Sequence, residues 1–321
     1  MQYAEIPYVE KKVSRILFGS CMEPFLSGGD DDALLDAMTE LGVTSIDTAR
    51  MYGGAEEVLG RWMEKRGNRD QIVLLSKCAH HDVDTMKKRI SETEIRKDFA
   101  ISSEKLRTPF IDIYLLHRDD PDVPAGEVVE IMNALHAEGK IGAFGGSNWT
   151  VERIEEANEY AYSHGLIPFS VSSPNFGLAV QVRDPWGGGA ISISGEEGAD
   201  ARAWYIRNKM PVIAYSSLGR GFFTGKLKST DEGREDQILD KFAVRGYSCP
   251  ENFERLRRCE ELAAQKQASV AQVAMSWIFR QKLDVFAVVS TSSAERMRSN
   301  IEALSLELTE VECRYLEYGK E

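Results

Sequence analysis

Four side chains that can hold or transfer a proton occur at the ends of short apolar runs, or just after them. Asp47, Lys77 and His117 each close such a run, and Tyr52 lies in the loop that follows Asp47. In α/β barrels, polar residues at the C-terminal ends of the strands form the active site. We therefore expect an acid, a phenol, an amine and an imidazole to converge at one face of the fold.

These four groups together suit general-acid catalysis beside a hydride donor. A phenol has an unperturbed pKa of about 10, which is too high for efficient proton donation near neutral pH. The ammonium of Lys77 would lower the pKa of Tyr52, and the carboxylate of Asp47 would keep that ammonium charged. The imidazole of His117 could then hydrogen-bond the substrate oxygen. Singly, each residue has a structural explanation, such as a turn cap or a core histidine; jointly they favour a catalytic site.

The elements that must position these residues alternate between strands and helices. Alternation of this kind predicts parallel βαβ units, and the number of strands favours a (β/α)₈ TIM barrel, here preceded by a hairpin over residues 3–15. The expected strands are residues 16–19, 44–47, 72–76, 110–116, 141–146, 169–171, 211–215 and 285–289. One expected helix begins near Asp30–Asp32, and others span 56–64, 84–106, 127–138 and 151–164, the last of these capped by Thr150. Three later helices are expected to start at capping boxes on Ser269, Ser292 and Thr309.

Two long irregular stretches, residues 175–200 and 216–250, interrupt this alternation. Long loops in a compact domain are usually functional, so we expect both at the C-terminal face, contacting cofactor and substrate. No interdomain linker is visible, and the sequence predicts one domain over residues 1–321.

Composition narrows the classes of function. The net charge of −12 argues against nucleic-acid or anionic-membrane partners. The five cysteines form no CxxC pair, and neither a signal-peptide core nor a membrane-length apolar run is present, which predicts a soluble cytoplasmic protein. The five histidines have no zinc-like spacing, so no metal is expected. The expected partner is a small molecule, and the oligomeric state is left open.

Five segments in order, DTARMYGG, LLSK, LLHRDD, GKIGAFGGSNW and AYSSLGRGFFTGK, resemble the aldo-keto reductase superfamily, and the similarity runs from Ile16 to Asn300. The resemblance implies that Tyr52 is the general acid/base, that Lys77 and Asp47 tune it, and that His117 orients the carbonyl. It also implies a nicotinamide cofactor bound in extended form without a Rossmann fold, in agreement with the lack of a GxGxxG motif after a strand.

The cofactor residues follow from the same resemblance. Ser147 and Asn148 match the pair that holds the nicotinamide carboxamide, Tyr215 matches the aromatic residue that stacks on the ring, and Arg296 matches the arginine at the adenine and 2′-phosphate. The full expected set is Gly19, Ser20, Asp47, Ser147, Asn148, Ser173, Tyr215, Ser216, Leu218, Arg220, Lys226, Ser290, Ser292, Arg296 and Asn300. The expected substrate contacts are Cys21, Tyr52, His117 and Trp149.

Three departures from the family pattern bear on specificity. Only hydroxyls stand at Ser290–Ser292, where a cation is usual, so NADP(H) is favoured while NAD(H) stays possible. Ser173 replaces a carboxamide-binding glutamine. Cys21 and Met22 replace a pocket tryptophan, which indicates a roomier or more polar pocket.

The leading hypothesis is a reductase of aldehydes, ketones or sugar carbonyls. A second is an NAD-dependent dehydrogenase that oxidises a sugar or polyol. A third makes Lys77 a Schiff-base lysine, against which the neighbouring Asp47 argues because it would keep the amine protonated. A fourth is a non-catalytic, cofactor-sensing binding module, which would have no need of the four proton-handling residues.

Overall fold

The computed structural model describes residues 1–319, and within them eight parallel strands form a closed barrel in the order β10-β3-β4-β5-β6-β7-β8-β9. The predicted TIM barrel is thus confirmed, as is the N-terminal hairpin, in which β1 (Tyr3–Ala4) pairs antiparallel with β2 (Val13–Ser14). The barrel strands are β3 (Ile16–Gly19), β4 (Ser45–Asp47), β5 (Val73–Cys78), β6 (Ile111–Leu116), β7 (Ile141–Ser147), β8 (Val171–Ser173), β9 (Val212–Ala214) and β10 (Val285–Val289).

Internal contacts divide the chain into two compact units. The first holds residues 1–173 and 290–294, and the second holds residues 174–289 and the chain from Glu295 onward. The single-domain organisation therefore stays a prediction. Among the residues that the structure describes, no helix combines the length and the apolar character that a membrane crossing requires.

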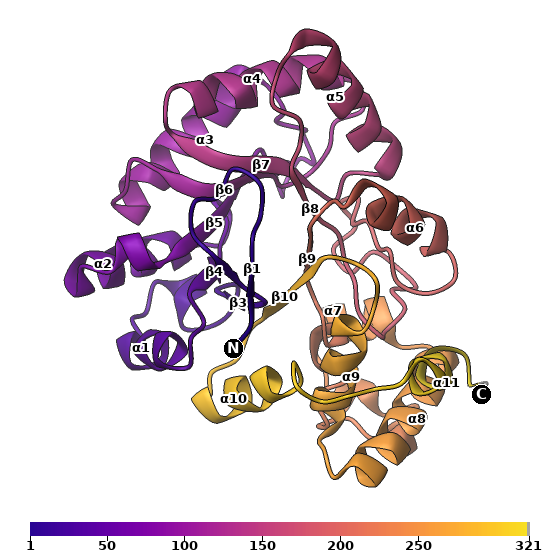
Figure 1. Ribbon diagram of the computed structural model, residues 1–321. Coiled ribbons are helices and arrows are strands. Elements are labelled where there is room, and N and C mark those ends of the chain that lie inside the picture. Colours follow the sequence, from indigo (N-terminus) through magenta and orange to yellow (C-terminus); the bar gives the residue numbers. More distant parts are fainter. Residues whose placement is uncertain (320–321) are drawn as a thin grey trace. The chain divides into compact units, whose positions relative to one another are not determined.

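The first unit contains β3 to β8 and the helices that follow them along the chain (Figure 1). Asp31 and Thr150 cap the first and last of these helices as predicted, accepting bonds from the backbone N–H groups of Leu34 and Arg153. The helices are α1 (Asp32–Glu40), α2 (Ala55–Arg66), α3 (Glu92–Leu106), α4 (Ala125–Ala137) and α5 (Val151–His164).

Strand register in this unit sets the positions of the catalytic candidates. Every residue of β5 and β6 is buried, as expected for parallel strands covered on both faces. Asp47 of β4 stands level with Leu75 of β5, and Lys77 of β5 stands level with Leu115 of β6. The C-terminal ends of adjacent strands therefore bring Asp47, Lys77 and the residue after β6, His117, close together.

The predicted helix over 84–106 is wrong in its first part, because α3 begins only at Glu92. Asp82 closes a local turn instead, accepting bonds from the backbone N–H groups of Asp84 and Thr85 at 3.1 and 2.8 Å. Met86 has a left-handed φ of 57°, and Ser91 caps the real helix. Side-chain bonds of this kind compete with a helix, and this segment has no buried apolar face to oppose them.

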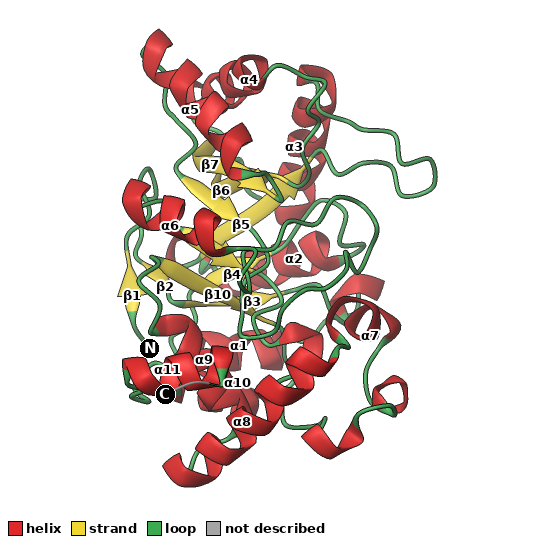
Figure 2. Ribbon diagram, turned by 90° about the vertical axis from the view of Figure 1, so that its right-hand side faces the viewer, coloured by secondary structure: helices red, strands yellow, loops and turns green. Residues whose placement is uncertain are grey.

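The second unit contains β9 and β10, paired in register from Val285 opposite Val212 to Ala287 opposite Ala214. The predicted capping boxes of Ser269 with Gln272 and of Thr309 with Glu312 are both confirmed. Helices α8, α9 and α11 pack against one another in this unit (Figure 2). Its helices are α6 (Ala199–Asn208), α7 (Lys241–Tyr247), α8 (Pro250–Lys266), α9 (Val270–Phe279), α10 (Ala294–Glu302, starting at the boundary) and α11 (Glu310–Tyr318).

Two expectations for local structure are corrected here. The stretch 216–250 is not irregular throughout, because Asp240 caps α7 by accepting bonds from the backbone N–H groups of Phe242 and Ala243. The sixth barrel strand is residues 171–173 rather than 169–171, so that Ser173 ends it. In both cases the short segment has too few residues for its periodicity to fix the boundaries.

Candidate active site

Lys77 and Asp47 form an ion pair that is almost fully enclosed. The Nζ atom of Lys77 lies 2.5 Å from Oδ1 of Asp47, and the two side chains are 4% and 7% exposed. The same ammonium donates to the carbonyl oxygen of Thr48 at 2.9 Å. Burial raises the pKa of Asp47, and the charge of Lys77 acts in the opposite direction. The lysine is thus fixed in place by two acceptors.

Tyr52 lies next to both the amine and the imidazole. The Nζ atom of Lys77 is 5.1 Å from the centre of the Tyr52 ring. The ring of His117 meets the Tyr52 ring edge-on, with centroids 5.7 Å apart. Tyr52 itself is only half-buried. The sequence prediction that these four residues converge agrees with this geometry.

Two glycines allow the loop that carries Tyr52 to take its path. Gly53 has a left-handed φ of 52°, and a Cβ there would lie 2.3 Å from the carbonyl oxygen of Leu26. A Cβ on Gly54 would lie 2.5 Å from the Cα of Gly28. Any larger residue would push the loop away from the segment 26–28, and the phenol would move with it.

His117 is buried at the end of β6, and its charge state follows from that burial. Burial and the positive charge of Lys77 hold its pKa well below the usual range for histidine. Its Nδ1 atom has no hydrogen-bond partner among residues 1–319. A neutral imidazole carries one N–H group. Because the enclosed Nδ1 has no acceptor for a proton among these residues, we place this N–H on Nε2. His117 can therefore donate a hydrogen bond at neutral pH without carrying charge.

Ser147 and Asn148, at the end of β7, lie beside His117. The side-chain amide of Asn148 donates to the carbonyl oxygen of His117 at 3.3 Å and to the hydroxyl of Ser147 at 3.1 Å. The hydroxyl of Ser147 donates to the carbonyl oxygen of Ser173 at 3.0 Å. A primary carboxamide needs both donors and acceptors, and this buried set of hydroxyls and an amide fits one.

Further expected cofactor residues of this unit lie around the end of β3. Ser20 donates from its backbone N–H and its hydroxyl to the carbonyl oxygen of Asp47 at 2.9 and 3.0 Å. The hydroxyl of Ser290 donates to the carbonyl oxygen of Gly19 at 2.8 Å. Ser292 is exposed. These contacts connect Gly19, Ser20 and Ser290 to the strand end that carries Asp47.

The other expected cofactor residues belong to the second unit. Arg220 pairs with Asp240 at 3.0 Å, and its guanidinium lies 5.5 Å from the centre of the Trp186 ring. Gly219, Arg220 and Gly221 have consecutive positive φ angles of 58°, 51° and 103°. Tyr215, Ser216, Leu218, Arg296 and Asn300 also lie in this unit, as does the exposed Lys226, and their roles stay predictions.

The expected substrate residues outside the catalytic group differ in their exposure. Cys21 is exposed. Trp149 is 1% exposed, packs on Phe169 with centroids 5.0 Å apart, and donates its indole N–H to the carbonyl oxygen of Arg118 at 3.3 Å. Trp149 thus supports the backbone next to His117, and a direct substrate contact stays a prediction for both residues.

Two residues outside the expected catalytic, cofactor and substrate sets lie against His117. The ring of His80 meets the His117 ring edge-on with centroids 4.7 Å apart, and burial lowers the pKa of His80 to about 4. Arg118 is buried and donates to the carbonyl oxygen of His117 at 3.3 Å. Each lies within three positions of an assigned catalytic residue, which is the one signal that could have pointed to them.

The structure is thus an eight-stranded parallel barrel with Asp47, Lys77, Tyr52 and His117 grouped beside the ends of its strands. The chain belongs to the aldo/keto reductase family, whose model matches residues 29–318.

The relatives of this chain include three fungal proteins. The chain is 26% identical over 283 residues to the aldo-keto reductase str7 of Strobilurus tenacellus, covering 87% of this chain and 77% of that protein. It is 29% identical over 296 residues to norsolorinic acid reductase A of Aspergillus parasiticus, covering 88% and 70%. It is 25% identical over 292 residues to the aldo-keto reductase yakc [NADP(+)] of Schizosaccharomyces pombe, covering 87% and 79%.

Proposed function

We propose that this enzyme reduces an aldehyde or ketone group, with Tyr52 as the general acid. The observation that carries the proposal is the buried Lys77–Asp47 ion pair beside the half-buried phenol of Tyr52. An enclosed charge pair contributes little net stability, whereas it is well suited to shifting the pKa of a neighbouring group.

A nicotinamide cofactor held by these residues would supply a hydride to the carbonyl carbon. Tyr52 gives its hydroxyl proton to the carbonyl oxygen. The ammonium of Lys77 stabilises the phenolate left behind, and Asp47 keeps that ammonium charged and oriented. The neutral imidazole of His117 donates a hydrogen bond to the same carbonyl oxygen and so holds the reacting group in position.

Ser147 and Asn148 would hold the carboxamide of the cofactor, with Ser173 beside them. NADP(H) is the favoured cofactor, in line with the relative that is named for NADP(+). The contributions of Tyr215, Arg220, Arg296 and the rest of the expected set rest on the resemblance alone. We also place the enzyme in the cytoplasm, acting on a small carbonyl compound.

Of the two alternative reactions, one remains a candidate and the other is disfavoured. Oxidation of a sugar or polyol with NAD⁺ stays a second candidate, since Ser290–Ser292 present hydroxyls and no cation for a 2′-phosphate. A Schiff base on Lys77 is disfavoured, because its ammonium is bonded to both Asp47 and Thr48 and would be a poor nucleophile.

Fluorescence titrations with NADPH and NADH, followed by turnover of a panel of aldehydes, ketones and sugars, test the proposal. Tighter binding of NADPH and reduction of at least one carbonyl class is the expected result. Tighter binding of NADH with oxidation of polyols would favour the second candidate. Cofactor binding without turnover of any carbonyl or polyol would leave the binding-module hypothesis. Binding of neither cofactor would refute all three.

A further inference from the structure

Arg118 is a buried cation without a carboxylate partner. It is 8% exposed, and within residues 1–319 no carboxylate lies in ion-pair distance of its guanidinium. One guanidinium nitrogen donates to the carbonyl oxygen of His117 at 3.3 Å, while Nε is enclosed and has no hydrogen-bond partner in the part of the chain that the structure describes. Such a group costs free energy unless something else compensates its charge.

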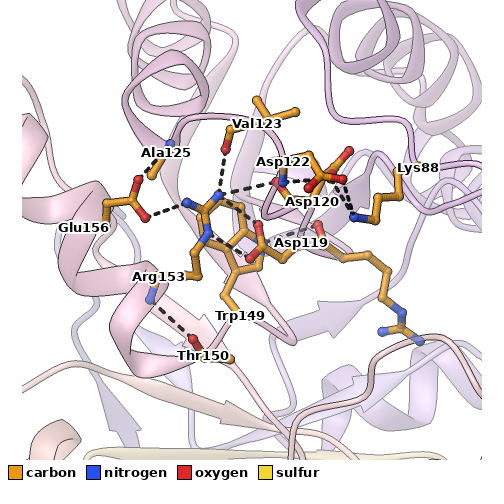
Figure 3. A network of polar contacts seen from close by, with 11 residues as sticks. Lys88, Asp119, Asp120, Asp122, Val123, Ala125, Trp149, Thr150, Arg153 and Glu156 are labelled. Carbon is orange, nitrogen blue, oxygen red and sulfur yellow. Dashed lines mark hydrogen bonds and ion pairs between the residues drawn. The ribbon is translucent and has the colours of Figure 1, made fainter.

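The acidic residues nearest in sequence do not compensate it, because other cations engage them (Figure 3). Arg153 of α5 binds Asp119 at 3.0 Å and also donates to the carbonyl oxygen of Val123 at 2.9 Å. Lys88 binds Asp120 at 2.8 Å and Asp122 at 3.3 Å. This network fixes the loop after β6 and turns its carboxylates toward Arg153 and Lys88.

The backbone of Arg118 is fixed as well. Its carbonyl oxygen accepts the indole N–H of Trp149 at 3.3 Å, and the ring of Trp149 lies 5.2 Å from the guanidinium carbon of Arg153. Burial is the main cause of the lowered pKa of His80 and of His117, and the nearby charge of Arg118 adds to both shifts. These contacts hold Arg118 next to His117, the residue that we propose orients the carbonyl, and leave the Nε–H group of Arg118 without an acceptor among residues 1–319.

We propose that Arg118 binds an anionic group, a carboxylate or a phosphate, on the carbonyl substrate, so that the enzyme selects acidic carbonyl compounds over neutral ones. The inference rests on the proposed function and adds a substrate class to it. A planar guanidinium can form two parallel charge-assisted bonds to either oxyanion, which a lysine cannot match.

Two matched substrate pairs test the proposal: 4-formylbenzoate with its methyl ester, and glyceraldehyde 3-phosphate with glyceraldehyde. The measured quantity is the ratio of kcat/KM within each pair, for the wild type and for Arg118→Gln. We expect the substitution to lower the ratio about 10- to 100-fold in at least one pair, because a charge-assisted bond is lost. The pair that responds identifies the carboxylate or the phosphate as the ligand.

Two further variants serve as controls. Arg118→Lys keeps the charge without the planar fork and should give an intermediate ratio. Arg96→Gln removes the same charge from α3, where Arg96 pairs with Glu92 and Glu138, and should leave the ratios unchanged within about two-fold. Equal loss for both members of each pair, or a loss of NADPH affinity instead, would overturn the proposal.

A binding measurement separates this proposal from the proposed function. Calorimetric titration with 4-(hydroxymethyl)benzoate, the alcohol product, and with its methyl ester reports the anion site without turnover. Selective binding of the acid, lost in Arg118→Gln, supports the site even if no carbonyl is reduced. Reduction of both neutral compounds, the methyl ester and glyceraldehyde, by a wild type that prefers neither acidic partner would refute the anion site and leave the reductase function intact.

Discussion

The ammonium of Lys77 lies 5.1 Å from the centre of the Tyr52 ring while it is bonded to Asp47. One cation is therefore shared between a permanent carboxylate partner and a phenol that becomes negative only when it gives up its proton. Because the permanent partner is Asp47, the phenol can be altered without leaving the buried lysine unpaired.

Tyr52→Phe should abolish most carbonyl reduction and leave the fold intact. The substitution removes the proton donor, which typically costs about 10²- to 10⁴-fold in rate, and keeps the ring that packs against His117. Steady-state reduction by the variant, with its cofactor affinity measured in parallel, checks the expectation. Turnover within a few-fold of the wild type would remove Tyr52 from the role of general acid.

Asp47→Asn and Lys77→Met should each destabilise the protein, and the double variant should be less destabilised than their sum. Breaking a buried pair from one side leaves an uncompensated charge, at about 3–5 kcal/mol, whereas removing both charges leaves none. Urea unfolding of the wild type and the three variants at pH 7.5 gives the coupling free energy between Asp47 and Lys77. Additive losses would show that the two side chains do not stabilise each other.

The proximity of Asp47, Tyr52, Lys77 and His117 could be predicted from the sequence because its signal is local. Each apolar run is short enough for its end to be visible, and in a parallel barrel those ends share one face. The pairing of Lys77 with Asp47 and the proximity of Tyr52 to His117 agree with that prediction.

The roles of His80 and Arg118 could not be predicted in this way. Whether a histidine is neutral, or an arginine lacks a counter-ion, depends on burial and on groups far away in sequence. Asp119 could in principle pair with its neighbour Arg118, and only the fold shows that it pairs with Arg153 instead. Helix α7 escaped prediction for a related reason, since its seven residues are too few to show a helical period.

Arg296→Ala should weaken the binding of NADPH more than that of NADH. If Arg296 contacts the 2′-phosphate, its loss removes charge-assisted bonds that only NADPH can make, with an expected effect of about 10- to 100-fold on Kd. Fluorescence titrations of the wild type and the variant with NADPH and with NADH give the dissociation constants to be compared. Arg298→Ala, an exposed change two positions further along α10, is the matched control. Equal weakening of both cofactors by Arg296→Ala would assign the 2′-phosphate to another residue.

His80→Asn should make the protein less sensitive to mild acid. Burial holds the native pKa of His80 at about 4, against about 6.5 in an unfolded chain, so the unfolded state takes up a proton first as the pH falls. The contribution of neutral His80 is complete above pH about 6.5 and declines toward pH about 4. It amounts to at most about 3 kcal/mol over that interval, of which about 2 kcal/mol falls between pH 7.5 and 5.0. Asparagine can replace the Nδ1–H bond to the carbonyl oxygen of His81, which spans 2.8 Å, without titrating.

The depressed pKa of His117 acts in the same direction but is present in both proteins. The difference between the urea unfolding curves of the wild type and His80→Asn at pH 7.5, 6.0 and 5.0 therefore reports the contribution of His80. Parallel loss of stability in the two proteins over this range would show that His80 is not held neutral by the fold.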